Sequence, residues 1–209
     1  MKQELLIGIT ESGVMHTDAD PPISLDTKFQ MVKESGVYDY FDKTPPLELE
    51  DDYRRCSEKY ELPILAGGWF YVLGRDEDLL MENLRLGARL GSLVHNTQIM
   101  MDHQGGSLVS DEQVVEIYLR AYETGEACGC RPTFEVHVNM WSEDFRRIEK
   151  VADLVEKQGI PFRMTLDHSH VIFKIDNPRE QEVFNIRESI ENGDLVLDPF
   201  QDNHVCGKW

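Results

Sequence analysis

Long hydrophobic runs are missing from this sequence. The chain has 209 residues, of which 41% are hydrophobic and 29% are charged. No apolar run approaches the roughly 20 residues that a transmembrane helix needs. The apolar stretch at 5–9 is too short for the core of a signal peptide, and it follows an acidic residue. We therefore expect a globular protein of the cytoplasm with one sizeable core and no membrane partner.

Positive charge is also scarce. The sequence holds 39 Asp and Glu residues against 21 Lys and Arg residues, which gives a formal net charge of -18. A field of that sign repels the phosphate backbone of DNA and RNA. We therefore expect no nucleic acid partner, and this disfavours an endonuclease.

Cysteines are few, and glycine-rich phosphate motifs are absent. Cys56, Cys128, Cys130 and Cys206 are too sparse for the disulfide framework of a small secreted domain, so we expect free thiols. The chain contains neither GxGxxG nor the Walker pattern GxxxxGK followed by Ser or Thr. These absences remove the sequence evidence for a nucleotide-binding sheet.

What the sequence does contain is a regular alternation of strand and helix patterns. We expect strands at 5–10, 37–42, 63–70, 92–100, 132–138 and 160–166, helices at 25–35, 50–60, 76–90, 110–126, 143–158 and 178–190, and a strand edge or buried loop at 195–199. Such alternation predicts a parallel sheet with helices outside it, either doubly wound or closed into a barrel. Because polar residues follow several strands and nucleotide motifs are absent, we favour the α/β barrel of the TIM (β/α)8 type.

The length of the chain does not suit a complete barrel. A barrel of eight strand–helix units typically needs about 250 residues, and the patterns above form six units. We predict one incomplete TIM-barrel domain over residues 1–209. Either the barrel is incomplete in this chain, or another polypeptide supplies the rest.

Metal-ligand chemistry is concentrated at the ends of the fifth and sixth expected strands. Alternation along 134–138 places Glu135 and His137 on one face and the apolar residues between them on the other. Asp167 closes the next strand and His170 follows it. The carboxyl ends of parallel strands meet at one end of a barrel, where active sites lie. Carboxylates with an imidazole suit Mn²⁺, Mg²⁺, Fe²⁺ or Zn²⁺ better than an ion that selects thiolates.

A second group of polar residues lies on or after the fourth expected strand. His95, Gln98 and His103 would together form the polar wall of a sugar-sized pocket, although each alone fits an ordinary loop residue equally well. Trp69, after the third strand, fits either a stacking platform for a sugar or a core position.

These residues carry a resemblance to a known family. Glu at the end of strand five, followed one helix later by Asp167-His168-Ser169-His170, resembles the xylose-isomerase-like TIM barrels, which include sugar isomerases and epimerases. Within that family, Glu135-Val136-His137 with Asp167 looks like the large subunit of bacterial C-glycoside deglycosidases. The resemblance implies that Glu135 and Asp167 bind a divalent metal, with Mn²⁺ first, and that His137 is the general base.

The resemblance also implies further partners. His170 would contact the substrate, and the family completes its metal shell from strands seven and eight, which we do not identify in this chain. A second protein subunit is therefore expected. The implied activity is a lyase that cleaves the C-glycosidic bond of 3-oxo-C-glycosides after taking the C2 proton. Two alternatives stay open: a metal-dependent sugar isomerase or epimerase that uses the same enediolate, and a non-catalytic subunit of a split barrel.

Overall fold

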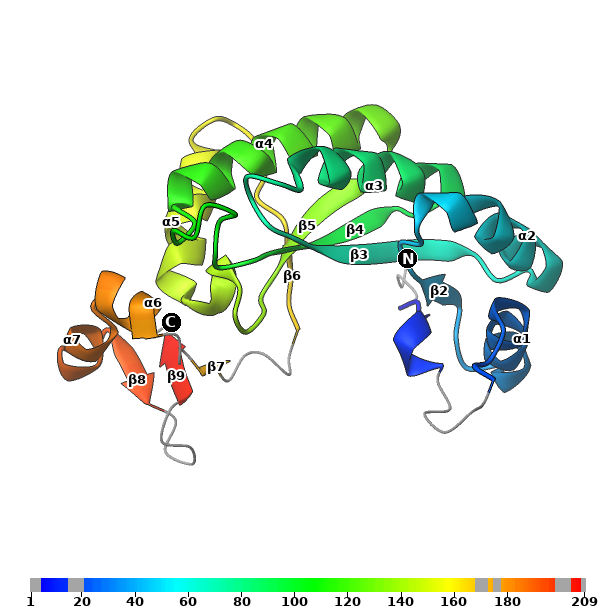
Figure 1. Ribbon diagram of the computed structural model, residues 1–209, viewed down its shortest axis with the longest axis horizontal. Coiled ribbons are helices and arrows are strands. Elements are labelled where there is room, and N and C mark those ends of the chain that lie inside the picture. Colours follow the sequence, from blue (N-terminus) through cyan, green and yellow to red (C-terminus); the bar gives the residue numbers. More distant parts are fainter. Residues whose placement is uncertain (1–4, 15–20, 168–172, 175–177, 198–203, 208–209) are drawn as a thin grey trace. The chain divides into compact units, whose positions relative to one another are not determined.

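The chain contains one parallel sheet with its strands in sequence order (Figure 1). The computed structural model describes residues 5–14, 21–167, 173–174, 178–197 and 204–207. The strands are β1 (Gly8–Thr10), β2 (Tyr40–Asp42), β3 (Ile64–Tyr71), β4 (Val94–Ile99), β5 (Arg131–Glu135) and β6 (Met164–Thr165), paired in the order β1-β2-β3-β4-β5-β6. Registers are described for β1–β2, β2–β3 and β5–β6, and each of these pairs is parallel.

The order of the strands decides between the two predicted architectures. A doubly wound sheet reverses its strand order at a switch point, whereas this sheet runs in one direction from β1 to β6. A helix connects each strand to the next: α1 (Leu25–Ser35), α2 (Glu50–Tyr60), α3 (Glu77–Leu90), α4 (Asp111–Cys128) and α5 (Phe145–Glu156). This is the winding of a (β/α) barrel with six of its strands, and the prediction of the fold class is confirmed.

Local signals account for the ends of the helices. Ser24 precedes α1, and its hydroxyl accepts a hydrogen bond from the backbone N–H of Thr27 at 3.1 Å. Gly36 ends α1 with φ 64°, a left-handed conformation that costs glycine little. At the start of α4, the Ser110 hydroxyl accepts from Gln113 N, while Gln113 Oε1 accepts from Ser110 N. This reciprocal pair is a capping box.

The C-terminal part adds a small sheet, of which the sequence predicted only the strand edge at 195–199. β7 (Phe173–Lys174), β8 (Leu195–Leu197) and β9 (His204–Gly207) pair antiparallel in the order β7-β9-β8. The single helix expected at 178–190 is wrong, because the structure has α6 (Pro178–Val183) and α7 (Ile186–Glu191). Asn185 between them has φ 49°, and a left-handed residue cannot continue a right-handed helix.

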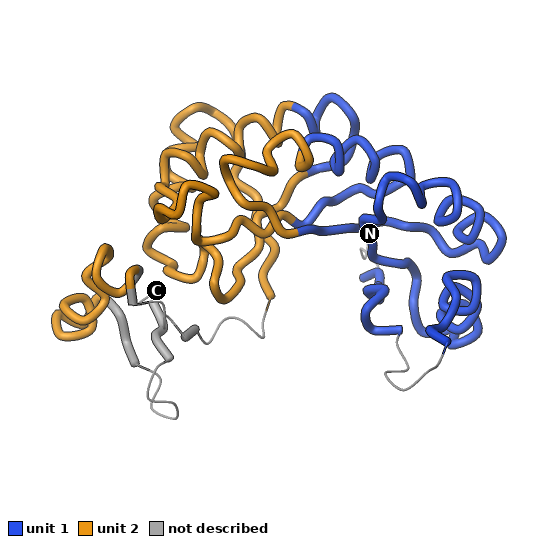
Figure 2. Tube along the Cα trace, viewed as in Figure 1, with its two compact units in different colours: residues 1–69, 81–96, 124–131 blue, residues 70–80, 97–123, 132–209 orange. Residues whose placement is uncertain are grey.

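The chain groups into two compact units (Figure 2). Unit 1 comprises residues 1–69, 81–96 and 124–131, and unit 2 comprises residues 70–80, 97–123 and 132–209. Among the described residues, no helix is long and apolar enough to cross a membrane. Cys56, Cys128 and Cys130 are free thiols, as expected, and the side chain of Cys206 lies outside the described residues.

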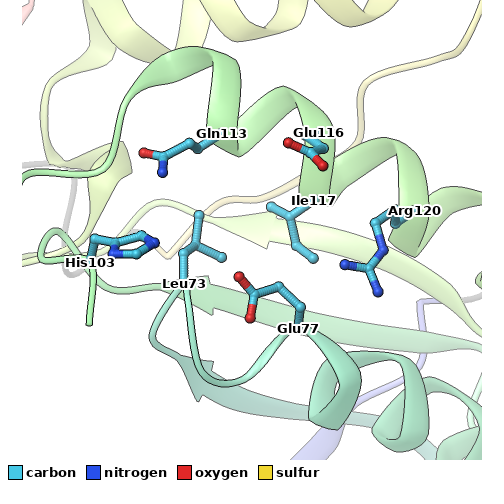
Figure 3. Close-up of a pocket in the computed structure, with 7 residues that line it drawn as sticks. All are labelled: Leu73, Glu77, His103, Gln113, Glu116, Ile117 and Arg120. Atoms are coloured by element: carbon cyan, nitrogen blue, oxygen red, sulfur yellow. The ribbon is translucent and has the colours of Figure 1, made fainter. Parts of the chain in front are cut away.

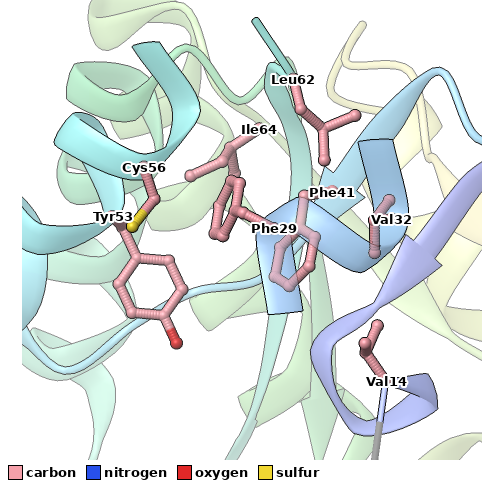
Figure 4. Packing of buried hydrophobic residues seen from close by; sticks show 8 residues of the cluster. All are labelled: Val14, Phe29, Val32, Phe41, Tyr53, Cys56, Leu62 and Ile64. Carbon is pink, nitrogen blue, oxygen red and sulfur yellow. The ribbon is translucent and has the colours of Figure 1, made fainter. Parts of the chain in front are cut away.

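The core of unit 1 packs α1 and α2 against the first strands (Figure 4). Phe29 of α1 stacks on Phe41 of β2, with ring centroids 4.3 Å apart and planes at 19°. Tyr53 of α2 meets the Phe29 ring edge-on. The cluster consists of Val14, Phe29, Val32, Phe41, Tyr53, Cys56, Leu62 and Ile64. Burial of this apolar surface is the main favourable term in holding the unit together.

The core of unit 2 sets the direction of the β5 side chains. Phe134 of β5 is fully buried and meets Tyr118 of α4 at 5.0 Å between ring centroids. Because successive side chains on a strand point to opposite faces, Glu135 faces away from the helix layer. This alternation places the Glu135 carboxylate on the opposite face of β5 from Phe134.

Candidate active site in unit 2

Glu135 is a buried carboxylate at the carboxyl end of β5. The residue is 5% exposed, and its Oε2 accepts a hydrogen bond from the Gln98 side-chain amide of β4. Buried residues alternate with half-buried ones along β4, which places Gln98 on the opposite face from Thr97 and Ile99. Two predicted site residues, Glu135 and Gln98, are therefore in direct contact.

β6 supplies the neighbouring part of the same face. Glu135 is in register with Thr165, and the hydroxyls of Thr133 and Thr165 lie 2.6 Å apart. Thr165 therefore points to the same side as Thr133 and Glu135. Asp167, the second predicted ligand, follows two residues later and is partly buried. His170, the predicted substrate contact, lies outside the described residues.

His137 does not continue the strand, which corrects the predicted end of that strand. We expected β5 to reach Val138, but it ends at Glu135, and the chain turns through Asn139, whose φ is 61°. His137 therefore takes its position from a loop rather than from strand alternation. The backbone N–H of His137 donates to Ser142 Oγ in the turn that follows, and Asn139 has the left-handed conformation that an extended strand cannot contain.

The contacts of the His137 ring assign its tautomer. Nδ1 lies 2.7 Å from the backbone oxygen of Val138. A carbonyl only accepts, so the neutral ring carries its proton on Nδ1 and its basic lone pair on Nε2. The Phe70 ring at the end of β3 meets the imidazole edge-on at 5.9 Å between centroids, and Phe70 is 47% exposed. A half-exposed aromatic ring therefore lies beside the imidazole.

The donor chemistry around Glu135 fits a hard divalent cation. Glu135 ends β5, and Asp167 follows the neighbouring strand β6 by two residues. Carboxylates with water and substrate oxygens are the usual ligands of Mg²⁺. Among the described residues, no group of three or more His, Cys, Asp or Glu side chains is arranged to hold a metal. The described residues therefore do not form a full protein shell for a metal, and the ligand roles of Glu135 and Asp167 stay a prediction.

His95 and Trp69 belong to unit 1. His95 is 1% exposed, and its Nδ1 lies 3.2 Å from the Thr44 hydroxyl. Burial lowers the pKa of His95 to about 3, because the charged ring would lose its hydration. The side chain is therefore a neutral core group. Trp69 is 45% exposed on β3.

His103 lines a separate pocket of unit 2 (Figure 3). The other lining residues are Leu73, Glu77, Gln113, Glu116, Ile117 and Arg120, which come from α3, α4 and the loop before α3. The His103 Nδ1 accepts a hydrogen bond from Gly105 N at 3.0 Å, so its neutral tautomer carries the proton on Nε2. Neither Glu135 nor His137 lines this pocket, and the role of His103 in substrate binding stays a prediction.

Three residues at the Glu135 site were missed by sequence reasoning. Phe70, Ser142 and Thr165 contact the predicted residues or lie in register with them. For Phe70 the signal was present, because it follows Trp69 directly, but the choice between adjacent aromatics depends on strand alternation. Ser142 carries no sequence signal, because its role comes from a turn that brings it back to β5.

No family model matches the chain, and no curated protein matches it. Solved structures do match. A 3-keto-D-glucoside 4-epimerase from E. coli is 13% identical, with a TM-score of 0.60 over 88% of this chain and 76% of that one. A xylose isomerase-like TIM barrel protein from Mycobacterium smegmatis, in complex with magnesium, is 12% identical with a TM-score of 0.56 over 86% and 70%.

A third match shows how the lengths compare. A probable 3-DHS dehydratase from Bacillus anthracis, involved in petrobactin synthesis, is 14% identical with a TM-score of 0.56. The match covers 79% of this chain and 64% of the dehydratase, so the chain spans less than two thirds of that protein. Together these likenesses show that the chain has the xylose isomerase-like TIM-barrel fold.

Proposed function

We propose that this chain carries the site of a divalent-metal-dependent enzyme that removes a proton beside the carbonyl of a 3-oxo sugar. Its specific reaction is proposed to be cleavage of the C-glycosidic bond of 3-oxo-C-glycosides. The observation that carries the proposal is the buried Glu135 carboxylate at the carboxyl end of β5, held by Gln98. In a TIM barrel this end of the strands is where active sites are built.

The metal would be held by Glu135 and Asp167, with Mn²⁺ or Mg²⁺ the ions that suit carboxylates. A bound cation supplies Lewis-acid stabilisation of negative charge on substrate oxygens. Gln98 orients the Glu135 carboxylate by donating to one of its oxygens. The fold shared with a magnesium-bound protein supports this choice of ion.

His137 supplies the base. With the proton on Nδ1 held by Val138, the Nε2 lone pair takes the C2 proton, which the C3 ketone acidifies. The electron pair of the C–H bond passes into an enediolate over C2 and C3. When the C3 carbonyl re-forms, a C1–C2 double bond forms and the bond from C1 to the aglycone carbon breaks. That carbon leaves with the electron pair and takes up a proton.

An epimerase or isomerase is the second candidate. It also begins by taking a proton from a carbon beside the sugar carbonyl, but a proton returns to the sugar, so no aglycone is released. The observation that favours it is the fold shared with a protein described as a 3-keto-D-glucoside 4-epimerase. The second subunit expected from the sequence stays a prediction. The substrate and the partners of the chain are proposals as well.

The first test is elemental analysis and product analysis on the purified chain and two variants. Glu135→Gln is expected to lose bound Mn²⁺, whereas His137→Ala keeps the metal and loses turnover. Glu116→Gln, an exposed carboxylate on α4, is the matched control and keeps both. If Glu135→Gln retains the metal, Glu135 is not a metal ligand. If His137→Ala keeps full turnover, His137 is not the general base.

Product analysis separates the candidate reactions. Incubation with a 3-oxo-C-glycoside is expected to release free aglycone at the rate at which sugar is consumed. Exchange of the substrate proton with deuterated water without aglycone release would favour the epimerase or isomerase. If the metal is bound and neither proton exchange nor aglycone release occurs, both the lyase and the epimerase or isomerase are contradicted.

A further inference from the structure

We infer that Ser142 is a positioning residue that fixes His137 relative to Glu135 and holds the imidazole in its basic tautomer. This inference rests on the proposed function. Ser142 is 0% exposed and lies in the short 3-10 turn η3 (Trp141–Glu143) between β5 and α5. Its hydroxyl therefore cannot contact substrate and acts only through its neighbours.

One hydroxyl connects the two proposed functional residues. Ser142 Oγ donates to the backbone oxygen of Glu135 at 2.5 Å and accepts from the backbone N–H of His137 at 3.4 Å. A hydroxyl has one proton and two lone pairs, so it makes both bonds at once. The bridge spans the place where the strand ends, and it holds the backbone on both sides of Val136.

The bridge determines where the His137 ring can donate. Nδ1 bonds the oxygen of the next residue, Val138, so this contact depends on the backbone conformation from His137 to Val138. Which nitrogen of an imidazole carries the proton is set by the hydrogen bond of the other nitrogen. If the backbone at His137 moves, the proton is no longer held on Nδ1, and Nε2 is no longer reserved as the base.

Other contacts hold the rest of the loop, so removal of the hydroxyl leaves the turn folded. The buried Glu143 accepts a hydrogen bond from Asn139 N at 2.8 Å, and Asn139 O accepts from Met101 N at 3.2 Å. Glu143 N also donates to Met140 O. Ser142→Ala therefore removes the bridge and leaves these bonds in place.

The experiment compares Ser142→Ala with Ser142→Thr, which keeps the hydroxyl. We expect kcat on a 3-oxo-glycoside to fall ~10- to 100-fold in Ser142→Ala with KM within ~3-fold, because small misplacements of a catalytic group cost that much. Ser142→Thr should recover most of this loss. Ser92→Ala, which changes an equally buried serine of unit 1 that is 2% exposed, is the control and keeps kcat.

A nitrogen NMR spectrum of the labelled His137 ring gives a readout that does not need turnover. At a pH where the ring is neutral, the native chain should show the proton on Nδ1, and Ser142→Ala should show it shared between both nitrogens. An unchanged tautomer together with unchanged kcat in a folded Ser142→Ala overturns the inference. If His137→Ala keeps full activity while the tautomer still shifts in Ser142→Ala, the proposed function fails and the positioning role stands.

Discussion

At the scale of single residues, His95 is a buried imidazole whose charge state controls stability. Its ordinary pKa is 6.5, and burial lowers the pKa in the folded chain to about 3. At a pH between these two pKa values, His95 is protonated in the unfolded chain and neutral in the folded chain. The contribution of His95 to stability is therefore complete above pH 6.5 and is lost as the pH falls from 6.5 towards 3.

This difference makes a prediction about acid unfolding. The free energy of unfolding should fall by about 1.4 kcal/mol per pH unit from this residue below pH 6.5. His95→Asn keeps a polar group for Thr44 without an ionisable ring. The slope of its free energy of unfolding against pH should therefore be smaller by the contribution of one proton, about 1.4 kcal/mol per pH unit. Urea titrations at pH 7, 6 and 5 measure both slopes. Identical slopes in the two proteins would show that His95 is protonated in the folded state.

A second residue-scale prediction concerns a buried ion pair. Arg147 of α5 is 3% exposed, and its Nε donates to Asp111 at the start of α4 at 2.7 Å. Arg147 also donates to Val109 O at 2.6 Å. Arg147→Met leaves Asp111 buried, and among the described residues the half-exposed Lys150 remains its ion-pair partner. We expect the free energy of unfolding to fall by about 3–5 kcal/mol, as when one partner of a buried ion pair is removed.

The matched control for that variant is Arg120→Met on α4. Arg120 pairs with Asp78, whose side chain is 99% exposed, and exposed pairs contribute about 0–1 kcal/mol. Chemical denaturation of the two variants measures the contrast. Equal losses would show that the Arg147 contact is no more important than a surface pair.

At the scale of elements, glycine lets β3 and β4 lie side by side in unit 1. A Cβ added at Gly68 would lie 2.9 Å from the Cβ and the backbone oxygen of Asn96. Backbone atoms cannot move aside as a long side chain can, so the strands themselves would have to separate. The close approach sets the position of the residues that follow on both strands.

We therefore predict that Gly68→Ala destabilises the chain by about 1–3 kcal/mol, the usual cost of overpacking. Gly105→Ala is the control, because the nearest atom to its Cβ is His103 Nδ1 at 3.4 Å, an ordinary contact. Thermal unfolding of both variants tests the difference. A Gly68→Ala variant as stable as the native chain would show that the strands separate at no cost.

At the scale of the whole molecule, the net charge of -18 makes the chain sensitive to any cation. General screening of self-repulsion depends on ionic strength alone. A ligand that binds only the folded state adds a separate term, about 2.7 kcal/mol when its free concentration is 100 times its Kd. The two effects can be separated by one side chain.

Mn²⁺ should raise the melting temperature of the native chain above its value in NaCl of the same ionic strength. In Glu135→Gln the two salts should act alike, because the buried carboxylate no longer binds the ion. Differential scanning calorimetry makes the comparison. An equal Mn²⁺ effect in both proteins would place the binding elsewhere.

Elements that depend on local signals could be predicted from the amino-acid sequence alone. The helix at 25–35 begins after Ser24 and ends at Gly36 as the sequence predicts, and the helix at 50–60 has its expected bounds. Caps and apolar periodicity act within a few residues, so they can be read without the fold. Alternation of apolar residues predicted Glu135 within a strand that reaches Val138, whereas β5 ends at Glu135.

Contacts between side chains of different elements could not be predicted before the fold was known. The bond from Gln98 to Glu135, the choice of Phe70 beside His137, and the return of Ser142 to β5 join residues from different elements. The turn after Glu135 also takes His137 out of the strand alternation. Such contacts depend on strand register and loop conformation, which are set by the packing of the whole sheet, and no local pattern in the chain encodes them.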